Sequence, residues 1–196
     1  MFPAVADATH MRTNGVLWRG WLPVSRGRRI ELSVHCCFPA TLVAVTWLLA
    51  MACFPRFFPG WHPAAYWLVA TTVALADSVA GLAHELGHAV VAMARGRQVY
   101  RITLYGLAAA VRRTSGAARP RDQFAIALAG PVSHLLIACA LLCAWNVLPI
   151  DNEPLRVATG FPAASNFAAG LLNLVPISPL DGARVARALI AGLVRV

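Results

Sequence analysis

The stretch His84-Glu85-Leu86-Gly87-His88 lies inside an apolar run that extends from Ala64 to Ala94. Ionisable side chains are costly to bury in such a run, and within a membrane span they usually serve a function. If the run is helical, His84 and His88 project from one face, because four residues make just over one turn. Two imidazoles so placed can hold one Zn²⁺, while Glu85 can reach a water on the metal. The stretch therefore predicts a long helix at membrane depth that carries most of a metal site.

The composition indicates an integral membrane protein. Of the 196 residues, 59% are hydrophobic and 13% are charged, whereas soluble domains average about 25% charged residues. All 17 basic residues are arginines, against 8 acidic residues, which gives a net charge of +9. These arginines flank apolar segments and do not form a separate basic domain. They therefore favour contact with membrane surfaces and argue against a nucleic-acid partner.

Four stretches are long and apolar enough to cross a bilayer, which takes about 20 residues. They cover residues 32–55, 64–94, 123–150 and 157–180. The predicted fold class is therefore an all-α integral membrane protein with about four transmembrane helices and a small β-hairpin at the cytoplasmic membrane surface. Residues 1–31 form a cytoplasmic N-terminal segment in this interpretation, and residues 32–196 form one intramembrane domain.

The placement of the arginines predicts the orientation. Only Arg56 and Arg156 fall in loops on one side, and the other arginines precede the first span, lie in the connection 95–121 or follow the fourth span. The positive-inside rule then puts both termini and that connection in the cytoplasm. An alanine-rich chain whose basic residues are all arginines also suggests a GC-rich bacterial genome, so we expect a multi-pass protein of the bacterial inner (plasma) membrane.

The predicted hairpin lies in the connection 95–121. Residues Gln98 to Tyr105 are of β type, and Gly106 can supply a turn before the next apolar residues. An open strand edge near the bilayer needs a pairing partner or a cavity, so such a hairpin could receive an extended substrate strand near Leu104 and Gly106. The alternative is a loop that only packs on the helices.

Two histidines do not complete a catalytic zinc site, which normally takes three protein ligands and a water. Asp122 and Asp151 lie at the ends of spans, whereas Asp181 closes the segment Asn173-Leu-Val-Pro-Ile-Ser-Pro-Leu-Asp181-Gly182. The prolines and the glycine of this segment would break the fourth span and let a carboxylate turn toward the interior of the bundle. We therefore expect Asp181 to be the third ligand.

Three ordered motifs together resemble the site-2 protease family of intramembrane zinc metalloproteases, peptidase family M50. They are the His84–His88 stretch, Ala129-Gly130-Pro131 in the third span, and the Asn173–Gly182 segment. The resemblance implies a three-helix core in which His84, His88 and Asp181 bind one Zn²⁺ per chain and Glu85 is the catalytic base. Two positions depart from the family pattern. His134 stands where the family has the asparagine of Gly-Pro-x-x-Asn, and a second glycine is absent after Gly106.

The resemblance implies a zinc metalloendopeptidase that cuts transmembrane segments of membrane-tethered regulatory proteins, such as anti-sigma factors. Its partners are then the lipid bilayer and a transmembrane protein substrate. Asn173 or His134 could add a hydrogen bond to the oxyanion, or each could simply join two helices. The alternative function is that of a catalytically silent homologue that binds or retains membrane proteins, against which the intact set of ligands and base argues.

Three further features are weaker candidates for a function. Asp77 lies seven residues before His84 on the same helix face, too far away to bind the same metal, so we expect it to aid water access or to pair with an arginine. His35 is expected to be an interfacial residue. Cys36 and Cys37 are expected to behave as small apolar residues.

Overall fold

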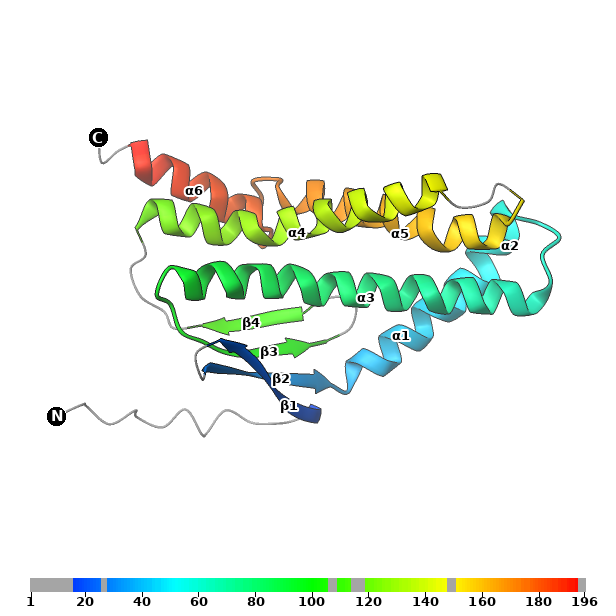
Figure 1. Cartoon of the computed structure of the whole chain (residues 1–196), viewed down its shortest axis with the longest axis horizontal. Coiled ribbons are helices and arrows are strands. Elements are labelled where there is room, and N and C mark those ends of the chain that lie inside the picture. The colour runs from blue at the N-terminus through cyan, green and yellow to red at the C-terminus, as the bar shows by residue number, and fades with distance from the viewer. Residues whose placement is uncertain (1–15, 26–27, 106–108, 114–118, 148–150, 194–196) are drawn as a thin grey trace.

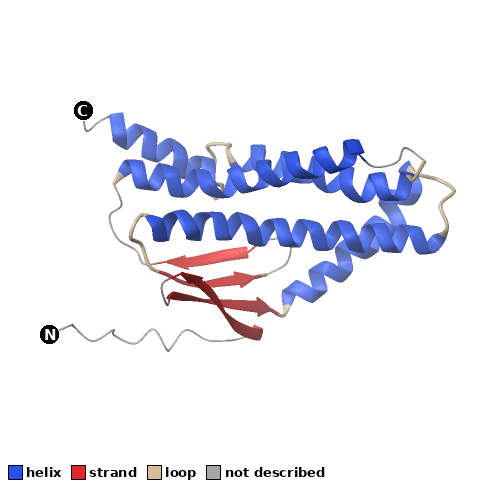
Figure 2. Cartoon of the chain, in the orientation of Figure 1, coloured by secondary structure: helices blue, strands red, loops and turns tan. Residues whose placement is uncertain are grey.

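The computed structural model describes residues 16–25, 28–105, 109–113, 119–147 and 151–193. In chain order the elements are β1 (Val16–Ser25), β2 (Arg28–His35), α1 (Cys37–Leu48), the π-helical turn η1 (Leu49–Cys53), α2 (Phe54–Phe57), α3 (Pro63–Ala94), β3 (Val99–Leu104), β4 (Ala109–Arg113), α4 (Pro120–Val147), α5 (Glu153–Asn173) and α6 (Asp181–Leu193). Long helices lie side by side, and the strands form one small sheet against them (Figure 1 and Figure 2). The predicted fold class, helical with a small β element, is confirmed.

Helix α3 is the longest element and carries the His84–His88 stretch. Its 32 residues span about 48 Å, which exceeds the roughly 30 Å of a bilayer's hydrocarbon core. It begins where the His62 side chain accepts a hydrogen bond from the Ala64 N–H at 3.3 Å, with Pro63 in the first turn. It ends just before Gly96, whose φ of +74° is a conformation that commonly terminates helices.

Helices α3 and α4 pack closely because small residues lie between them. A Cβ built on Gly87 would collide with the Ser133 hydroxyl and would lie 2.9 Å from the Ala129 carbonyl oxygen. Small residues at helix contacts are what membrane bundles use to bring backbones together, since lipid gives no hydrophobic drive for association. This close contact brings the backbone of α4 next to the His84–His88 face of α3.

The sheet has the order β1-β2-β3-β4, with antiparallel outer pairs and a parallel central pair, β2 with β3. In the parallel pair Ser33 lies opposite Thr103, and the two buried hydroxyl oxygens are 2.8 Å apart. The sheet packs on α3 through a core of apolar side chains that includes Ala89, Ala92 and Ile102. It therefore lies along the half of α3 that contains the two histidines (Figure 1).

The sheet is larger than the hairpin that we expected. Strands β3 and β4 are that hairpin, but β1 and β2 come from residues 16–35, which we had assigned to an N-terminal segment and the start of the first span. Strand β2 continues to His35, and helix α1 starts at Cys37 instead of at Leu32. The reason is that residues 31–34 pair with β3, and this pairing satisfies their backbone as strand.

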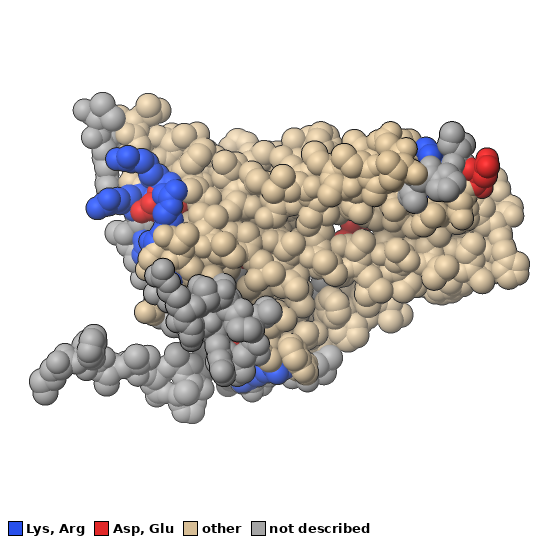
Figure 3. Space-filling view, in the orientation of Figure 1, with Lys and Arg blue, Asp and Glu red and all other residues tan. Residues whose placement is uncertain are grey.

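Three helical segments of the described chain are long and apolar enough to cross a membrane: Cys37–Phe57, α3 and α4. Helix α5 has 21 residues, about 30 Å of helix, but it is less apolar, so its crossing stays a prediction. Figure 3 shows most of the charged side chains near the two ends and on the underside of the molecule, and a largely uncharged surface between the ends, with a recessed acidic spot in it. Such a distribution is typical of a protein whose middle faces lipid.

The topology can be tested with reporter fusions. We expect a fusion after Arg121 and one at the C-terminus to report a cytoplasmic location, and a fusion at Asn152 to report the opposite side, because most of the arginines lie near the first two positions and only Arg156 lies near the third. Paired phosphatase and fluorescent-protein fusions at each site measure this. A cytoplasmic signal at Asn152 would mean that α4 does not cross the membrane.

Candidate metal centre

His84 and His88 lie one turn apart on α3, and their side chains converge. The two Nε2 atoms are 3.1 Å apart, and the rings meet nearly at right angles, with centroids 4.7 Å apart. Both residues are buried, with 7% and 2% of their surface exposed. The predicted i, i+4 pairing on one helix face is thus the geometry of the structure.

Asp181 meets the two histidines from α6. Its Oδ2 atom lies 3.0 Å from His84 Nε2 and 2.9 Å from His88 Nε2, and the residue is 4% exposed. The chain reaches this point because α5 ends at Asn173 and a turn containing Pro176 and Pro179 leads into α6. His84, His88 and Asp181 therefore bring three possible ligand atoms together in the interior.

The hydrogen bonding of His88 shows that this group suits a cation. His88 Nδ1 lies 2.6 Å from the Ile126 carbonyl oxygen, which can only accept, so Nδ1 carries the hydrogen. The neutral ring then has a lone pair at Nε2, and that atom faces His84 Nε2 and a carboxylate oxygen. When His84 Nδ1 also carries its hydrogen, three electron-pair donors face one another, and a positive ion between them removes their repulsion, so the residues fit a bound metal.

Gly130 of α4 leaves the room that this group needs. A Cβ built there would collide with His88 Nε2 and would lie 2.6 Å from His84 Nε2. Gly182 has the same importance for Asp181, because a Cβ on it would collide with the carbonyl groups of Leu174 and Val175. Only glycine therefore lets α4 and α6 approach the three ligand atoms as they do.

Arg184 holds the other oxygen of the Asp181 carboxylate. Its guanidinium donates a hydrogen bond to Oδ1, while Oδ2 faces the histidines. Such outer partners orient metal ligands and tune their basicity. His88 has the Ile126 carbonyl as its outer partner, whereas the buried Nδ1 of His84 has no hydrogen-bond partner among the described residues.

Glu85 is adjacent to this group but separate from it. It lies on α3 between the histidines, is partly buried, and does not share the cluster of three ligand atoms. No described residue forms a hydrogen bond or an ion pair with its carboxylate. The Glu85 carboxylate can therefore accept a proton from another group, whereas both oxygens of Asp181 already have partners.

The other expected site residues lie at different distances from this group. The His134 ring is 4.8 Å from the His84 ring and is buried. Asn173 lies at the end of α5, where its amide donates to the Ala169 carbonyl oxygen at 3.0 Å. Leu104 is buried at the end of β3, paired with Ala109. Gly106 lies outside the described residues.

Asp77 has partners that the sequence did not indicate. Its Oδ1 accepts hydrogen bonds from the Ser165 hydroxyl and the Asn166 amide, and no described arginine pairs with it. The sequence did not indicate Ser165 and Asn166 as partners of Asp77. It also did not indicate Arg184 as the partner of Asp181. For Asn166 a signal existed, since an amide side chain inside an apolar span usually has a polar partner.

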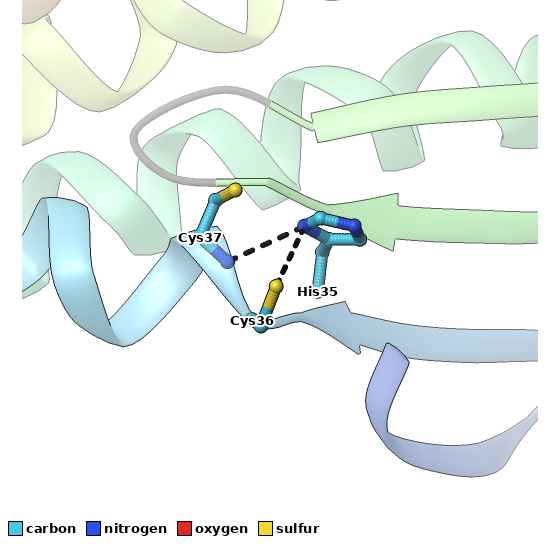
Figure 4. Close-up of side chains that lie close together, drawn as sticks. All are labelled: His35, Cys36 and Cys37. Atoms are coloured by element: carbon cyan, nitrogen blue, oxygen red, sulfur yellow. Dashed lines mark hydrogen bonds between the residues drawn. The ribbon is translucent and has the colours of Figure 1, made fainter. Parts of the chain in front are cut away.

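A second group of possible ligands, His35, Cys36 and Cys37, lies where β2 leads into α1 (Figure 4). His35 Nδ1 accepts from the Cys37 backbone N–H at 3.3 Å and lies 3.7 Å from the Cys36 sulfur. The imidazole also packs on Tyr105, with centroids 4.9 Å apart. The three residues are consecutive, and the ring nitrogen already serves the first turn of α1, so the group is explained by local structure.

Known proteins share this sequence and fold. The model of the M50B-like peptidase family matches residues 60–149. Rip3 of Mycobacterium tuberculosis, named as a candidate zinc metalloprotease, is 33% identical over 176 residues, which cover 87% of this chain and 44% of Rip3. The similarly named protein sll0528 of Synechocystis is 32% identical over 152 residues, which cover 76% of this chain and 38% of that protein. The solved site-2 protease of Methanocaldococcus jannaschii has the same fold, with a TM-score of 0.56 at 22% identity over 89% of this chain and 73% of that one.

The chain belongs to the site-2 protease family. The resemblance inferred from the three sequence motifs is therefore confirmed, and the protein is a metalloprotease homologue of the site-2 protease type. It spans less than half the length of the two bacterial relatives. In this site-2 protease homologue His84, His88 and Asp181, which belong to the family motifs, have their ligand atoms close together.

The ligand assignment can be tested by metal content. We expect the purified protein to hold about one zinc per chain, and Asp181→Ala to weaken zinc retention by at least about 100-fold, because it removes one of three protein ligands. Zinc measured after competition with a chelator gives this value. Asp77→Ala is the matched control, since it removes a carboxylate two turns from His84 and should keep the metal. Equal retention in both variants would reject Asp181.

The space at Gly130 gives a second test. Gly130→Ala should displace the histidines and lower zinc retention while the protein still extracts from the membrane as a folded helical species. Gly192→Ala is the control, because a Cβ there would meet only Pro120 Cβ at 4.0 Å. Unchanged zinc binding in Gly130→Ala would show that the backbone of α4 does not limit the site.

Proposed function

We propose that this protein is an intramembrane zinc endopeptidase that hydrolyses peptide bonds in or near transmembrane segments of membrane-tethered regulatory proteins. The observation that carries the proposal is the position of Glu85 beside three converging ligand atoms on a helix that can also span a membrane. In this proposal His84, His88 and Asp181 hold the zinc, and Glu85 is the catalytic base.

Zinc bound at this site would polarise the scissile carbonyl and lower the pKa of a coordinated water toward about 7. Glu85 takes a proton from the attacking water and passes it to the leaving amine. The side chain suits this task because it is partly buried next to His84 and is not held by a described ion pair. Asn173 and His134 are candidates for further contacts with the substrate or the oxyanion.

The substrate would have to be extended at the site, because a helical peptide bond is shielded by its own hydrogen bonds. Strand β4 supports a way to hold such a segment. One of its edges pairs with β3, the other has no partner among the described strands, and the strand packs beside α3. Addition of a substrate strand to this edge would provide backbone hydrogen bonds near the catalytic residues. Leu104, at the end of β3, and Gly106, which lies outside the described residues, are then candidate contacts.

The protein would act from the cytoplasmic side of a bacterial inner membrane. Arginines surround the end of the bundle where α3 ends and α4 begins, and Arg95 forms an ion pair with Asp122 there. Positive charge is retained on the cytoplasmic side of membrane proteins. Products released at that end would enter the cytoplasm, which suits substrates that carry a regulatory domain there.

The proposal is tested by Glu85→Gln, which keeps the size of the side chain but cannot accept a proton. We expect the variant to retain zinc and the fold and to lose at least about 100-fold in cleavage rate per zinc-loaded molecule. Cleavage of co-expressed, tagged single-span membrane proteins measures the rate. Asp122→Asn, which removes a carboxylate that is not part of the ligand cluster, is the control and should cleave like the wild type.

Two outcomes would contradict this proposal. Cleavage by Glu85→Gln within a few-fold of wild type would remove the assigned base. Stable complexes between the wild type and membrane proteins, with no cleavage of any of them by zinc-loaded protein, would instead identify a silent homologue that binds or retains its partners.

A further inference from the structure

Hydrogen-bonded polar side chains from three helices lead up to the candidate metal site, where the last of them packs against His84. Asp77 lies on α3, His134 on α4, and Ser165 and Asn166 on α5. Asn166 is 2% exposed and His134 is 8% exposed. None of them belongs to the group of three ligand atoms. Polar groups at this depth are costly unless they hydrogen-bond, so their hydrogen bonds indicate what they do.

The orientation of the Asn166 amide is fixed by its neighbours. Its Nδ2 donates to the Pro162 carbonyl oxygen at 2.8 Å and to Asp77 Oδ1 at 3.1 Å. A carbonyl oxygen can only accept, so the NH₂ group must face Pro162. The amide oxygen of Asn166 therefore faces His134, and its direction does not depend on the charge of Asp77.

This orientation determines which nitrogen of His134 carries the hydrogen. His134 Nδ1 lies 2.7 Å from Asn166 Oδ1, and an amide oxygen is an acceptor, so Nδ1 must donate. The neutral ring then has its lone pair at Nε2. With the ring 4.8 Å from that of His84, the site gains a hydrogen-bond acceptor next to the metal ligands.

We propose that Asp77, Asn166 and His134 form a positioning chain that holds the His134 ring in the Nδ1–H form, so that Nε2 accepts a hydrogen bond from the reacting groups. Asp77 fixes Asn166, and Asn166 fixes His134. The proposal rests on the proposed function and deepens it. It replaces the role of oxyanion donor expected for His134 with that of an acceptor, since the neutral ring has no hydrogen at Nε2.

Two groups could donate this hydrogen bond to His134 during peptide hydrolysis: a backbone N–H of the substrate and the attacking water. Steady-state kinetics distinguish them. If His134 accepts from a backbone N–H of the bound substrate, its loss raises KM and leaves kcat nearly unchanged. If it accepts from the attacking water, its loss lowers kcat at constant KM. A role confined to stability alters neither value per folded, zinc-loaded molecule.

The chain offers a matched set of variants. Asn166→Leu removes the acceptor for Nδ1 and keeps a side chain of similar size. The exchange Asp77→Asn with Asn166→Asp puts a carboxylate next to His134 and an amide at position 77. That carboxylate can only accept, so the exchange again requires the hydrogen on Nδ1 of His134. Ser165→Ala removes a hydroxyl bonded to Asp77 and leaves the bond between Asn166 and His134 intact.

The direct test is the ¹⁵N spectrum of the histidine rings in the full-length protein, with His134 assigned by comparison with His134→Asn. We expect the Nδ1–H form of His134 in the wild type, in Ser165→Ala and in the exchange variant, and a mixture of forms in Asn166→Leu. Cleavage per zinc-loaded molecule should fall by about 10-fold in Asn166→Leu, the loss expected for one hydrogen bond to the reacting groups, and should be higher in the exchange variant than in Asn166→Leu.

A wild-type spectrum with the hydrogen on Nε2 would overturn the proposal, as would an Asn166→Leu variant that keeps both the tautomer and the cleavage rate. The spectrum does not depend on catalysis. A wild type that shows the Nδ1–H form but cleaves no substrate therefore refutes the proposed function and leaves the hydrogen-bonded chain established.

Discussion

Three side chains that can each donate an electron pair converge in the interior of this protein, and such a cluster suits a positive ion between them. His84, His88 and Asp181 place their ligand atoms within 2.9–3.1 Å of one another. The Ile126 carbonyl fixes the lone pair of His88 toward that point. Arg184 already pairs with the outer oxygen of the Asp181 carboxylate, and a metal ion would satisfy the inner oxygen together with the two imidazoles. Gly130 and Gly182 leave the space that this cluster needs between the helices, and Arg184 orients the carboxylate of Asp181.

The surrounding fold delivers these side chains to one point in an apolar environment. Helix α3 supplies the histidines from one face, and the interruption between α5 and α6 turns Asp181 inward. The sheet lies along the same half of α3 as the two histidines, and β4, which has one edge unpaired among the described strands, packs beside that helix. Such an edge is tolerated near a membrane when it is buried in protein or meets a partner. In the proposed function, this part of the helix bundle combines a metal site with a place for an extended substrate chain.

Local spacing explains which parts of this protein were predictable from the sequence. The histidine pair follows from a four-residue separation on a helix, and Asp181 follows from the prolines and glycine that interrupt its span. Strands β1 and β2 were not predicted, because β2 is defined by parallel pairing with β3, and the partners Ser33 and Thr103 are 70 positions apart. The bond between His134 and Asn166 was missed for the same reason, since each residue alone is only a polar side chain in an apolar span.

X-ray absorption at the zinc edge of the purified protein would identify the atoms that bind the metal. With His84, His88 and Asp181 as ligands, we expect a first shell of nitrogen and oxygen at about 2.0–2.1 Å, with two imidazole rings and without sulfur. We also expect this shell to lose an oxygen ligand in Asp181→Ala. A sulfur shell at about 2.3 Å would contradict this ligand assignment and would place the metal at His35, Cys36 and Cys37 instead.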